Sequence, residues 1–258
     1  MDLVELAPSQ ADIVDGRSPG GANTSHTIAV DLLTRLLAGV PQTGSLDDYL
    51  TAAVEGNLLG RATVEGRRRA VRYLREVYLL DSRRVLFRAL RDLWAEDPAA
   101  HAQLAGLSAY ARDSVFRASG GAVLPLLPGS SVLSDDLTTA VTVAFPGAYN
   151  ESTAGKVGRN TASSWTQTGH LVGRTKKVRT KIEATLPAAA YALLIGHLEG
   201  SRGQALYDTS WTCFLDTSPH DMASLADGAG RRGYLEVRNA GGVVEIGFRH
   251  LLRRQNGG

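Results

Sequence analysis

The chain has 258 residues, of which 43% are hydrophobic and 21% charged, a composition typical of a globular protein of one or two domains. Its single cysteine, Cys213, excludes an internal disulfide and a multi-cysteine metal site. The sequence does not begin with a basic segment and an apolar run, and no stretch approaches the roughly 18 apolar residues that span a bilayer. We therefore expect a cytoplasmic protein with no membrane partner.

The basic residues are clustered, although the net charge is only +2. Residues 61–91 hold ten basic and three acidic residues, residues 151–181 hold seven and one, and residues 228–258 hold six and two. Such clusters create a local field that attracts polyanions even on a nearly neutral protein. A solvated helix face explains each cluster as well on composition alone, so local structure has to decide.

The N-terminal half is predicted to be helical after a lead-in. Residues 1–27 are expected to be irregular or mobile, because they are rich in Pro, Gly, Ser and Asn and lack periodicity. A helical domain is predicted over residues 28–120. Its helices are expected at 28–39, 45–56, 63–80, 82–96 and 99–119, with Ser45 and Thr63 as N-caps.

The helix at 63–80 has an arginine-rich side. Arg67 falls on the apolar side of this helix, whereas Arg68, Arg69, Arg72 and Arg75 lie opposite the apolar stripe. With the helix at 45–56 it predicts a pair like a helix-turn-helix. The candidate phosphate contacts are Arg61, Arg68, Arg72 and Arg75. An exposed arginine face with no ligand is an equally good interpretation.

A second domain is predicted over residues 130–258, after a Pro- and Gly-rich boundary at 120–129. Ser134 is the expected N-cap of a helix that reaches Phe145. The next helix is expected to begin at Asn150 or Ser152 and to end near Thr168. Trp165 anchors its apolar arc, and the opposite arc carries no acid. That arc has the side chains that bind phosphates and base edges, namely Ser152, Thr153, Lys156, Arg159, Asn160, Ser163 and Gln167.

A basic β-hairpin is predicted directly after this helix. The apolar pair at 171–172 precedes a turn at 173–176, and residues 177–182 then alternate between basic and apolar or small side chains. The candidate DNA contacts of the hairpin are Arg174, Lys176, Lys177, Arg179 and Lys181. A polar helix followed by a basic hairpin is the layout of a winged helix-turn-helix. The predicted fold class is mainly α with small β-hairpin wings.

The remaining sequence patterns indicate structural roles and not catalytic or ligand-binding ones. A second, less basic hairpin is predicted at 235–248, where packing or dimerisation is the better interpretation. The six histidines are isolated, and no carboxylates cluster. Gly228, Gly230 and Gly233 match a dinucleotide-binding motif but follow a helix instead of a strand. We therefore expect no catalytic residue, metal, cofactor or small-molecule substrate.

Several short strings resemble the BrxA family, an accessory component of the BREX (bacteriophage exclusion) defence systems. They are Asn57-Leu58-Leu59-Gly60, the arginine-rich 67–75, residues 86–94, residues 110–113, residues 151–153 and residues 163–166. The resemblance covers roughly residues 28–250. It implies a small, mostly helical, non-enzymatic protein that binds double-stranded DNA and works beside other defence proteins.

The leading hypothesis is therefore a cytoplasmic protein that binds double-stranded DNA through the helix at 152–167, the hairpin at 170–182 and the arginines of 63–80. A protein-docking scaffold of a defence complex is the first alternative, because winged helices with basic surfaces also bind proteins. RNA binding by the N-terminal half and a transcriptional regulator are the others.

Overall fold

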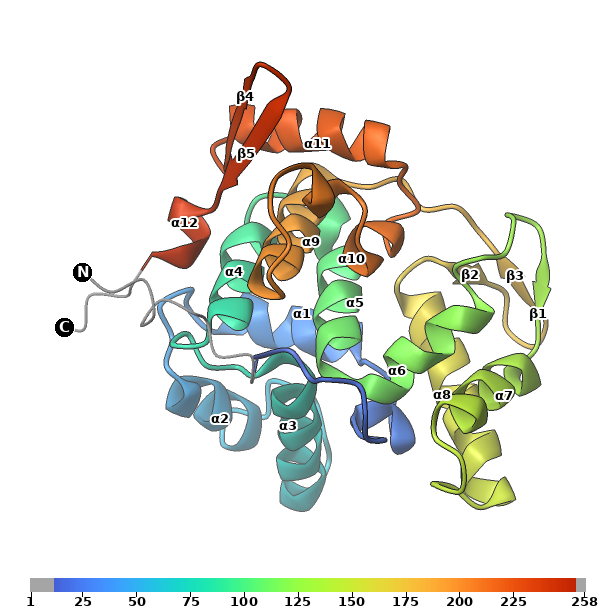
Figure 1. Ribbon diagram of the computed structural model, residues 1–258. Helices are drawn as coiled ribbons and strands as arrows, with labels where there is room; N and C mark the ends of the chain where they lie inside the picture. The colour runs from blue at the N-terminus through green and yellow to red at the C-terminus, as the bar shows by residue number, and fades with distance from the viewer. Residues whose placement is uncertain (1–11, 254–258) are drawn as a thin grey trace.

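The computed structural model describes residues 12–253, and within them the chain forms twelve α-helices and two small antiparallel sheets (Figure 1). Helix accounts for 57% of the structure, which confirms the mainly helical class. The helices are α1 Val30–Gly39, α2 Leu46–Val54, α3 Val64–Tyr78, α4 Val85–Trp94, α5 His101–Arg112, α6 Ser114–Ser119, α7 Ser134–Ala144, α8 Glu151–Gln167, α9 Leu186–Leu198, α10 Ser210–Cys213, α11 Pro219–Arg231 and α12 Arg249–Leu252. None of the helices within residues 12–253 has the length and apolar character needed to cross a membrane.

Side-chain caps begin the helices where the sequence predicts them. The hydroxyl of Ser45 accepts from the Asp48 amide at 3.2 Å at the start of α2, and that of Thr63 accepts from the Gly66 amide at 3.0 Å at the start of α3. The Asn150 side chain accepts from the Thr153 amide at 2.9 Å and begins α8. Each cap satisfies an amide that has no partner within its helix.

Two helix boundaries differ from the prediction. The helix expected over 99–119 is interrupted at Asp113, which is fully buried and caps α6 by accepting from the Phe116 amide at 2.8 Å. Ser134 is the first residue of α7 and not its cap. Instead, Asp136 reaches back to accept from the Leu133 amide at 2.8 Å, as an acidic residue in the first turn can.

The described part of the N-terminal lead-in, residues 12–27, has an irregular backbone, as expected, while residues 1–11 lie outside the described residues. Its short 3₁₀ helix η3, Ala22–Thr24, places Asn23 at full burial. The Asn23 amide and side-chain nitrogen donate to Asp113 at 2.8 and 2.9 Å. The Asn23 side-chain oxygen accepts from the Ser164 hydroxyl at 2.6 Å, which joins the segment to α8.

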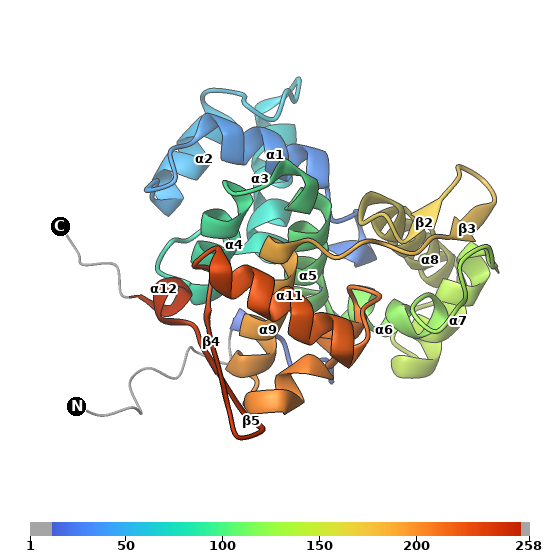
Figure 2. The same cartoon turned by 90° about the horizontal axis from the view of Figure 1, so that it is seen from above.

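The main core is built around α5 and α9, which lie side by side in the middle of the molecule (Figures 1 and 2). Residues 187–196 of α9 are all buried, as expected of a helix that is apolar on every side. One cluster of buried apolar side chains extends from Ala22 to Leu251 and so includes residues of both predicted domains. The division at 120–129 remains a prediction.

The strands are β1 Ser131–Val132, β2 Leu171–Val172, β3 Lys177–Arg179, β4 Glu236–Ala240 and β5 Val243–Gly247. The hairpin expected at 171–182 exists as β2 and β3, but β1 pairs with the other edge of β3 and gives the order β1-β3-β2. The second predicted hairpin is β4–β5, in which Ile246 is buried.

Arg179 corrects the predicted pattern of the first hairpin. It lies in the central strand and is 2% exposed, where it forms an ion pair with Asp216. Its Nε also donates to the Val123 carbonyl at 3.0 Å. The prediction that Arg179 contacts DNA from an outer face is therefore wrong, because the Asp216 carboxylate and the Val123 carbonyl, which come from other parts of the chain, hold its guanidinium in the interior.

His170 is buried against the aromatic rings of Trp165 and Phe214, with ring centroids 4.9 and 4.7 Å from its own. Its Nε2 lies 2.7 Å from the Phe214 carbonyl oxygen, which only accepts, so Nε2 carries the proton of the neutral ring. The Thr168 hydroxyl lies 2.8 Å from Nδ1 and 3.0 Å from the Trp165 carbonyl oxygen, to which it donates. Burial lowers the pKa of His170 to about 4.

We expect Arg179→Met to destabilise the protein by about 3 kcal/mol or more, because it leaves the Asp216 carboxylate buried without its partner. The double variant Arg179→Met, Asp216→Asn should recover part of this loss. Asparagine is neutral and tolerates the left-handed backbone that Asp216 adopts (φ 54°). Urea unfolding of the wild type and the variants measures the coupling. Equal stability of Arg179→Met and the wild type would contradict the structural role of Arg179.

We expect the stability advantage of the wild type over His170→Gln to shrink by about 3 kcal/mol between pH 7 and pH 4. The unfolded chain protonates His170 near pH 6.5 and the folded chain only near pH 4, so acid favours unfolding over this interval. Asp113, whose pKa burial raises to about 6, acts in the opposite direction in both proteins and cancels in the comparison. Urea unfolding across pH checks this, and a difference independent of pH would contradict it.

Candidate nucleic-acid interface

Helix α8 is held tightly against α7 on one side. Its Val157 and Trp165 are fully buried, and Gly158 faces the first turns of α7. A Cβ at Gly158 would lie 2.5 Å from the Ser134 carbonyl oxygen, so only glycine permits this close approach of the two helices. Val141 of α7 and Phe145, the residue after α7, join Val157 and Val115 in a small apolar cluster of their own. The packing fixes which side of α8 faces outward.

The N-terminal half of α8 carries the exposed part of the predicted face. Ser152, Lys156 and Arg159 are exposed, while Thr153 and Ser163 are half-buried. The two cations lie on one side of the helix, since they are three residues apart. This half of the predicted face therefore stands available to a ligand.

The N-terminal segment packs against the C-terminal half of that face and forms hydrogen bonds with it. The Asn160 side-chain nitrogen donates to the Asn23 carbonyl at 3.1 Å, and the Gln167 side-chain oxygen accepts from the Val30 amide at 2.9 Å. Both side chains are half-buried. The prediction that all seven residues present their polar groups outward is thus wrong for these two groups, because the segment at 22–30 packs along this part of α8.

The predicted cations of the hairpin other than Arg179 lie in the β2–β3 loop, in β3 or just after β3. Arg174, Lys176 and Lys181 are exposed. Lys177 is half-buried, and its ammonium donates to the Gly173 carbonyl at 2.8 Å. Partial burial lowers the pKa of Lys177. Gly173 has φ +100°, a conformation that the tight turn requires and that favours glycine.

The arginines of α3 divide into structural and exposed members. Arg67 is half-buried and donates to the Val54 carbonyl at 3.0 Å, as its place on the apolar side predicts. Arg61 and the four arginines on the outer side of α3 are all exposed, namely Arg68, Arg69, Arg72 and Arg75.

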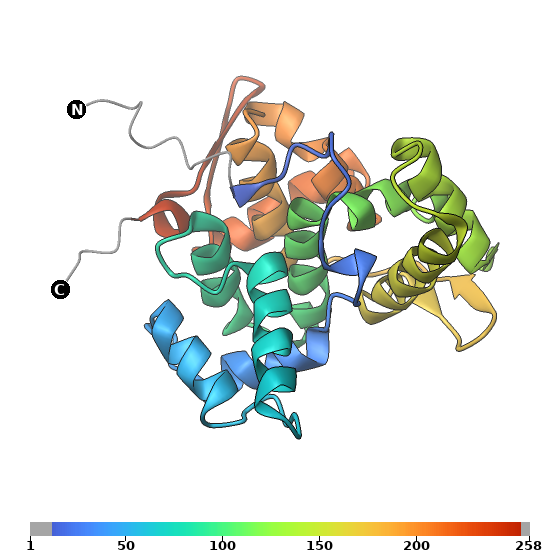
Figure 3. The same ribbon diagram turned by 90° about the horizontal axis from the view of Figure 1, so that it is seen from below.

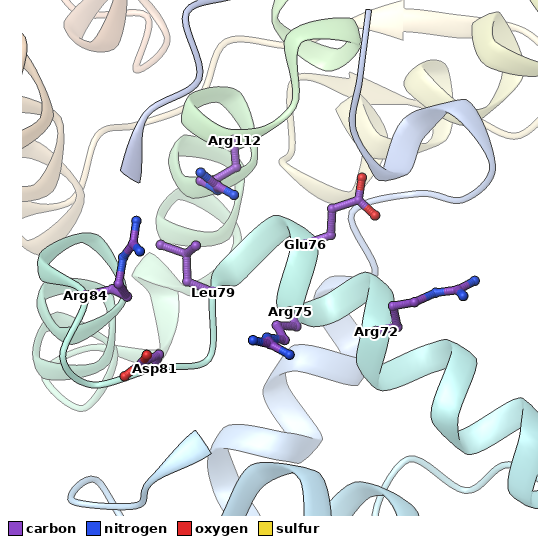
Figure 4. Close-up of a pocket in the computed structure, with 7 residues that line it drawn as sticks. All are labelled: Arg72, Arg75, Glu76, Leu79, Asp81, Arg84 and Arg112. Atoms are coloured by element: carbon purple, nitrogen blue, oxygen red, sulfur yellow. The ribbon is translucent and has the colours of Figure 1, made fainter. Parts of the chain in front are cut away.

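The outer arginines of α3 point in different directions. Figure 4 shows the Arg72 and Arg75 side chains extending away from each other, although both residues line the same cavity. The cavity there has a volume of about 310 Å³ and includes the acids Glu76 and Asp81 in its lining. Its positive charge is therefore partly neutralised by the protein itself.

Helices α3 and α8 meet at His26. The N-terminal segment passes between the two helices, as Figure 3 shows in dark blue. The His26 ring lies on that of Tyr73, with the centroids 3.6 Å apart, and the Arg72 guanidinium lies 5.3 Å from the Tyr73 centroid.

The field at His26 comes from both helices. Burial is the main cause of its lowered pKa, followed by the positive charges of Lys156, Arg69, Arg61 and Arg72 in that order. Two basic segments about 90 residues apart in the sequence therefore face one place. We name the surface formed by these four residues and Arg159 the basic face.

His26 and Arg69 were not among the predicted contact residues. Arg69 shares the outer side of α3 with Arg72, so helical periodicity alone could have added it. His26 lies in a segment without periodicity, and its role depends on the approach of α3 and α8, which no local signal reports.

No protein-family model matches the chain, and no curated protein matches it either.

Proposed function

We propose that this protein binds double-stranded DNA without catalysing a reaction. The observation that carries the proposal is the cavity at His26, which Arg61 and Arg69 line. Arg72, whose guanidinium lies 5.3 Å from the Tyr73 ring centroid, and Lys156 of α8 add their charges at this place. Clustered cations from separate elements, with no acid among these residues, attract a polyanion more strongly than an isolated helix face does.

The arrangement around α8 supports a winged helix as the binding unit. The elements follow the order α6, β1, α7, α8, β2, β3, and the sheet has the order β1-β3-β2. In this interpretation α8 enters the major groove with its N-terminal half, through Ser152, Lys156 and Arg159. The loop with Arg174 and Lys176 contacts the neighbouring phosphates, and the arginines of α3 extend the contact along the backbone.

The resemblance to the BrxA family supports placing this binding in a phage-defence system, beside the other proteins of that system. DNA binding of this kind depends on phosphates, so it requires neither a metal nor a cofactor.

A protein-docking role is the second candidate, and one observation favours it. Of the six large apolar side chains that stay exposed in residues 12–253, four lie in the segment at 127–172 that contains α7 and α8, namely Leu127, Leu133, Val143 and Val172. Exposed apolar groups of this kind suit a protein partner better than a phosphate backbone. Binding of a partner protein, with no gel shift of any duplex at low salt, would favour this role.

We expect the double variant Lys156→Glu, Arg159→Glu to abolish the gel shift of a random duplex at concentrations where the wild type binds. Two phosphate contacts become repulsive, while both residues are exposed and their loss leaves the core intact. The matched control is Arg231→Glu, Arg232→Glu, which makes the same change of charge on exposed residues at the end of α11, away from α3 and α8 (Figure 1). Loss of binding in both double variants, or in neither, would contradict the proposed interface.

We expect the logarithm of the DNA association constant to fall with the logarithm of salt concentration at a slope of about −4 to −5, as for roughly five phosphate contacts. The neutral variant Lys156→Gln, Arg159→Gln should make this slope shallower by about 2, because two contacts are lost. A fluorescence-anisotropy salt series measures both values. Duplex RNA as competitor should bind more weakly, since its deep, narrow major groove does not admit α8. An unchanged slope in the variant would show that these cations touch no phosphate.

A further inference from the structure

A cavity of about 460 Å³ lies beside His26, between α3, the start of α1 and α8. We name it the α3–α8 cleft. Its lining includes Arg61, Arg69, Tyr73 and Asn160 in addition to His26. The cleft therefore lies within the basic face and brings together side chains from four separate parts of the sequence.

One part of the cleft is apolar, and the two rings beside it are inclined to each other by 53°. Ala29, Leu32 and Ala70 line it, beside the packed rings of His26 and Tyr73. The lowered pKa of His26 keeps its ring neutral at pH 7. A neutral ring pair next to small apolar side chains is the type of surface on which a planar heteroaromatic ring stacks.

The other part of the cleft is cationic. Arg61 and Arg69 both line it and are exposed, and no Asp or Glu occurs among the described residues that line it. The cavity beside Arg75 differs in this respect, because Glu76 and Asp81 line it. An anion is thus better accommodated in the α3–α8 cleft, and guanidinium groups bind phosphate through paired hydrogen bonds.

Asn160 supplies a polar group between these two parts. Its side-chain nitrogen is engaged by the Asn23 carbonyl, whereas its side-chain oxygen has no hydrogen-bond partner within residues 12–253. That oxygen can accept a hydrogen bond from the exocyclic amino group of a base.

We propose that the α3–α8 cleft binds a single nucleotide, with the base on the apolar side near Tyr73 and Asn160 and the phosphate on Arg61 and Arg69. The nucleotide is either a free mononucleotide or an unpaired nucleotide of a DNA strand. The free form goes beyond duplex binding and does not depend on it, whereas the unpaired form rests on the DNA binding proposed above.

The first experiment measures binding of 2′-deoxyadenosine 5′-monophosphate to the full chain by isothermal titration calorimetry. We expect it to bind more tightly than deoxyadenosine or inorganic phosphate, since each of these satisfies only one part of the cleft. Arg69→Gln should weaken the nucleotide about tenfold, as loss of a charged hydrogen bond does, and Tyr73→Ala should weaken it by a similar factor through lost stacking. Arg68→Gln is the matched control and should change nothing, because Arg68 is exposed on α3 but does not line the cleft.

Three results of this titration would contradict the proposal. No heat at millimolar nucleotide, equal affinity for inorganic phosphate and the nucleotide, or equal weakening by Arg68→Gln and Arg69→Gln would each overturn the proposal. Tyr73→Phe keeps the ring and should retain binding, so it separates stacking from a folding defect in Tyr73→Ala.

The second experiment identifies the source of the nucleotide. It compares a fully paired duplex with the same duplex carrying a one-nucleotide bulge. Preference for the bulge that is lost in Arg69→Gln and in Tyr73→Ala supports an unpaired nucleotide, and equal affinity for both duplexes together with binding of the mononucleotide supports the free form. The variant Lys156→Glu, Arg159→Glu tests the paired duplex by itself, so the nucleotide site and the duplex interface can fail independently.

Discussion

The position of α8 depends on the hydrogen bonds of one buried asparagine. Asn23 donates twice to Asp113 at the start of α6, accepts from the Ser164 hydroxyl of α8, and receives the Asn160 side chain on its carbonyl oxygen. Inside a protein each of these polar groups costs free energy if it is left without a partner, so the arrangement is satisfied only when all the elements are in place. Burial raises the pKa of Asp113 to about 6, and the hydrogen bonds from Asn23 and Phe116 oppose that shift. These hydrogen bonds therefore connect the N-terminal segment to α6 and α8, and the segment holds α8 near α3.

The contacts of the N-terminal segment also determine which part of α8 is exposed. This segment uses the C-terminal half of the predicted α8 face for internal hydrogen bonds and leaves Lys156 and Arg159 exposed in the other half. In return it places His26 between the two helices, where the charges of Lys156 and three arginines act together. Fewer residues of α8 are exposed than predicted, but the positively charged surface extends from α8 to α3. At distances up to a Debye length, the attraction of a polyanion depends on the density of positive charge more than on the length of one helix.

Local sequence signals predict the helices well and long-range contacts poorly. Ser45 and Thr63 are predicted as caps, and Asn150 as one of two candidates with Ser152, because a cap and an apolar stripe lie within a few residues of one another. The prediction for Arg179 is wrong because alternation distinguishes the two sides of a strand but does not indicate which side is covered. The groups that bind this side chain, Val123 and Asp216, lie far from it in the sequence. His26 was missed because its surroundings come from parts of the chain far apart in sequence. Helical periodicity therefore predicts the exposed cations of α3 and α8, but it does not predict the contacts between distant segments that complete the candidate site.

The fate of the arginines shows why charge counts overstate a binding surface. In the segment at 61–91, Arg67 donates to a backbone carbonyl, Arg88 and Arg91 are buried, and Arg83 and Arg84 pair with Asp81 and Asp12. Arg117 is bound in the same way by the carbonyls of Val14, Tyr110 and Ala111. A guanidinium group has five N–H donors, so one arginine can donate hydrogen bonds to several backbone carbonyl oxygens at helix ends and in loops at the same time. In the segment at 61–91, Arg61, Arg68, Arg69, Arg72 and Arg75 are exposed, and these, with the cations of α8 and the β2–β3 loop, make up the proposed nucleic-acid surface.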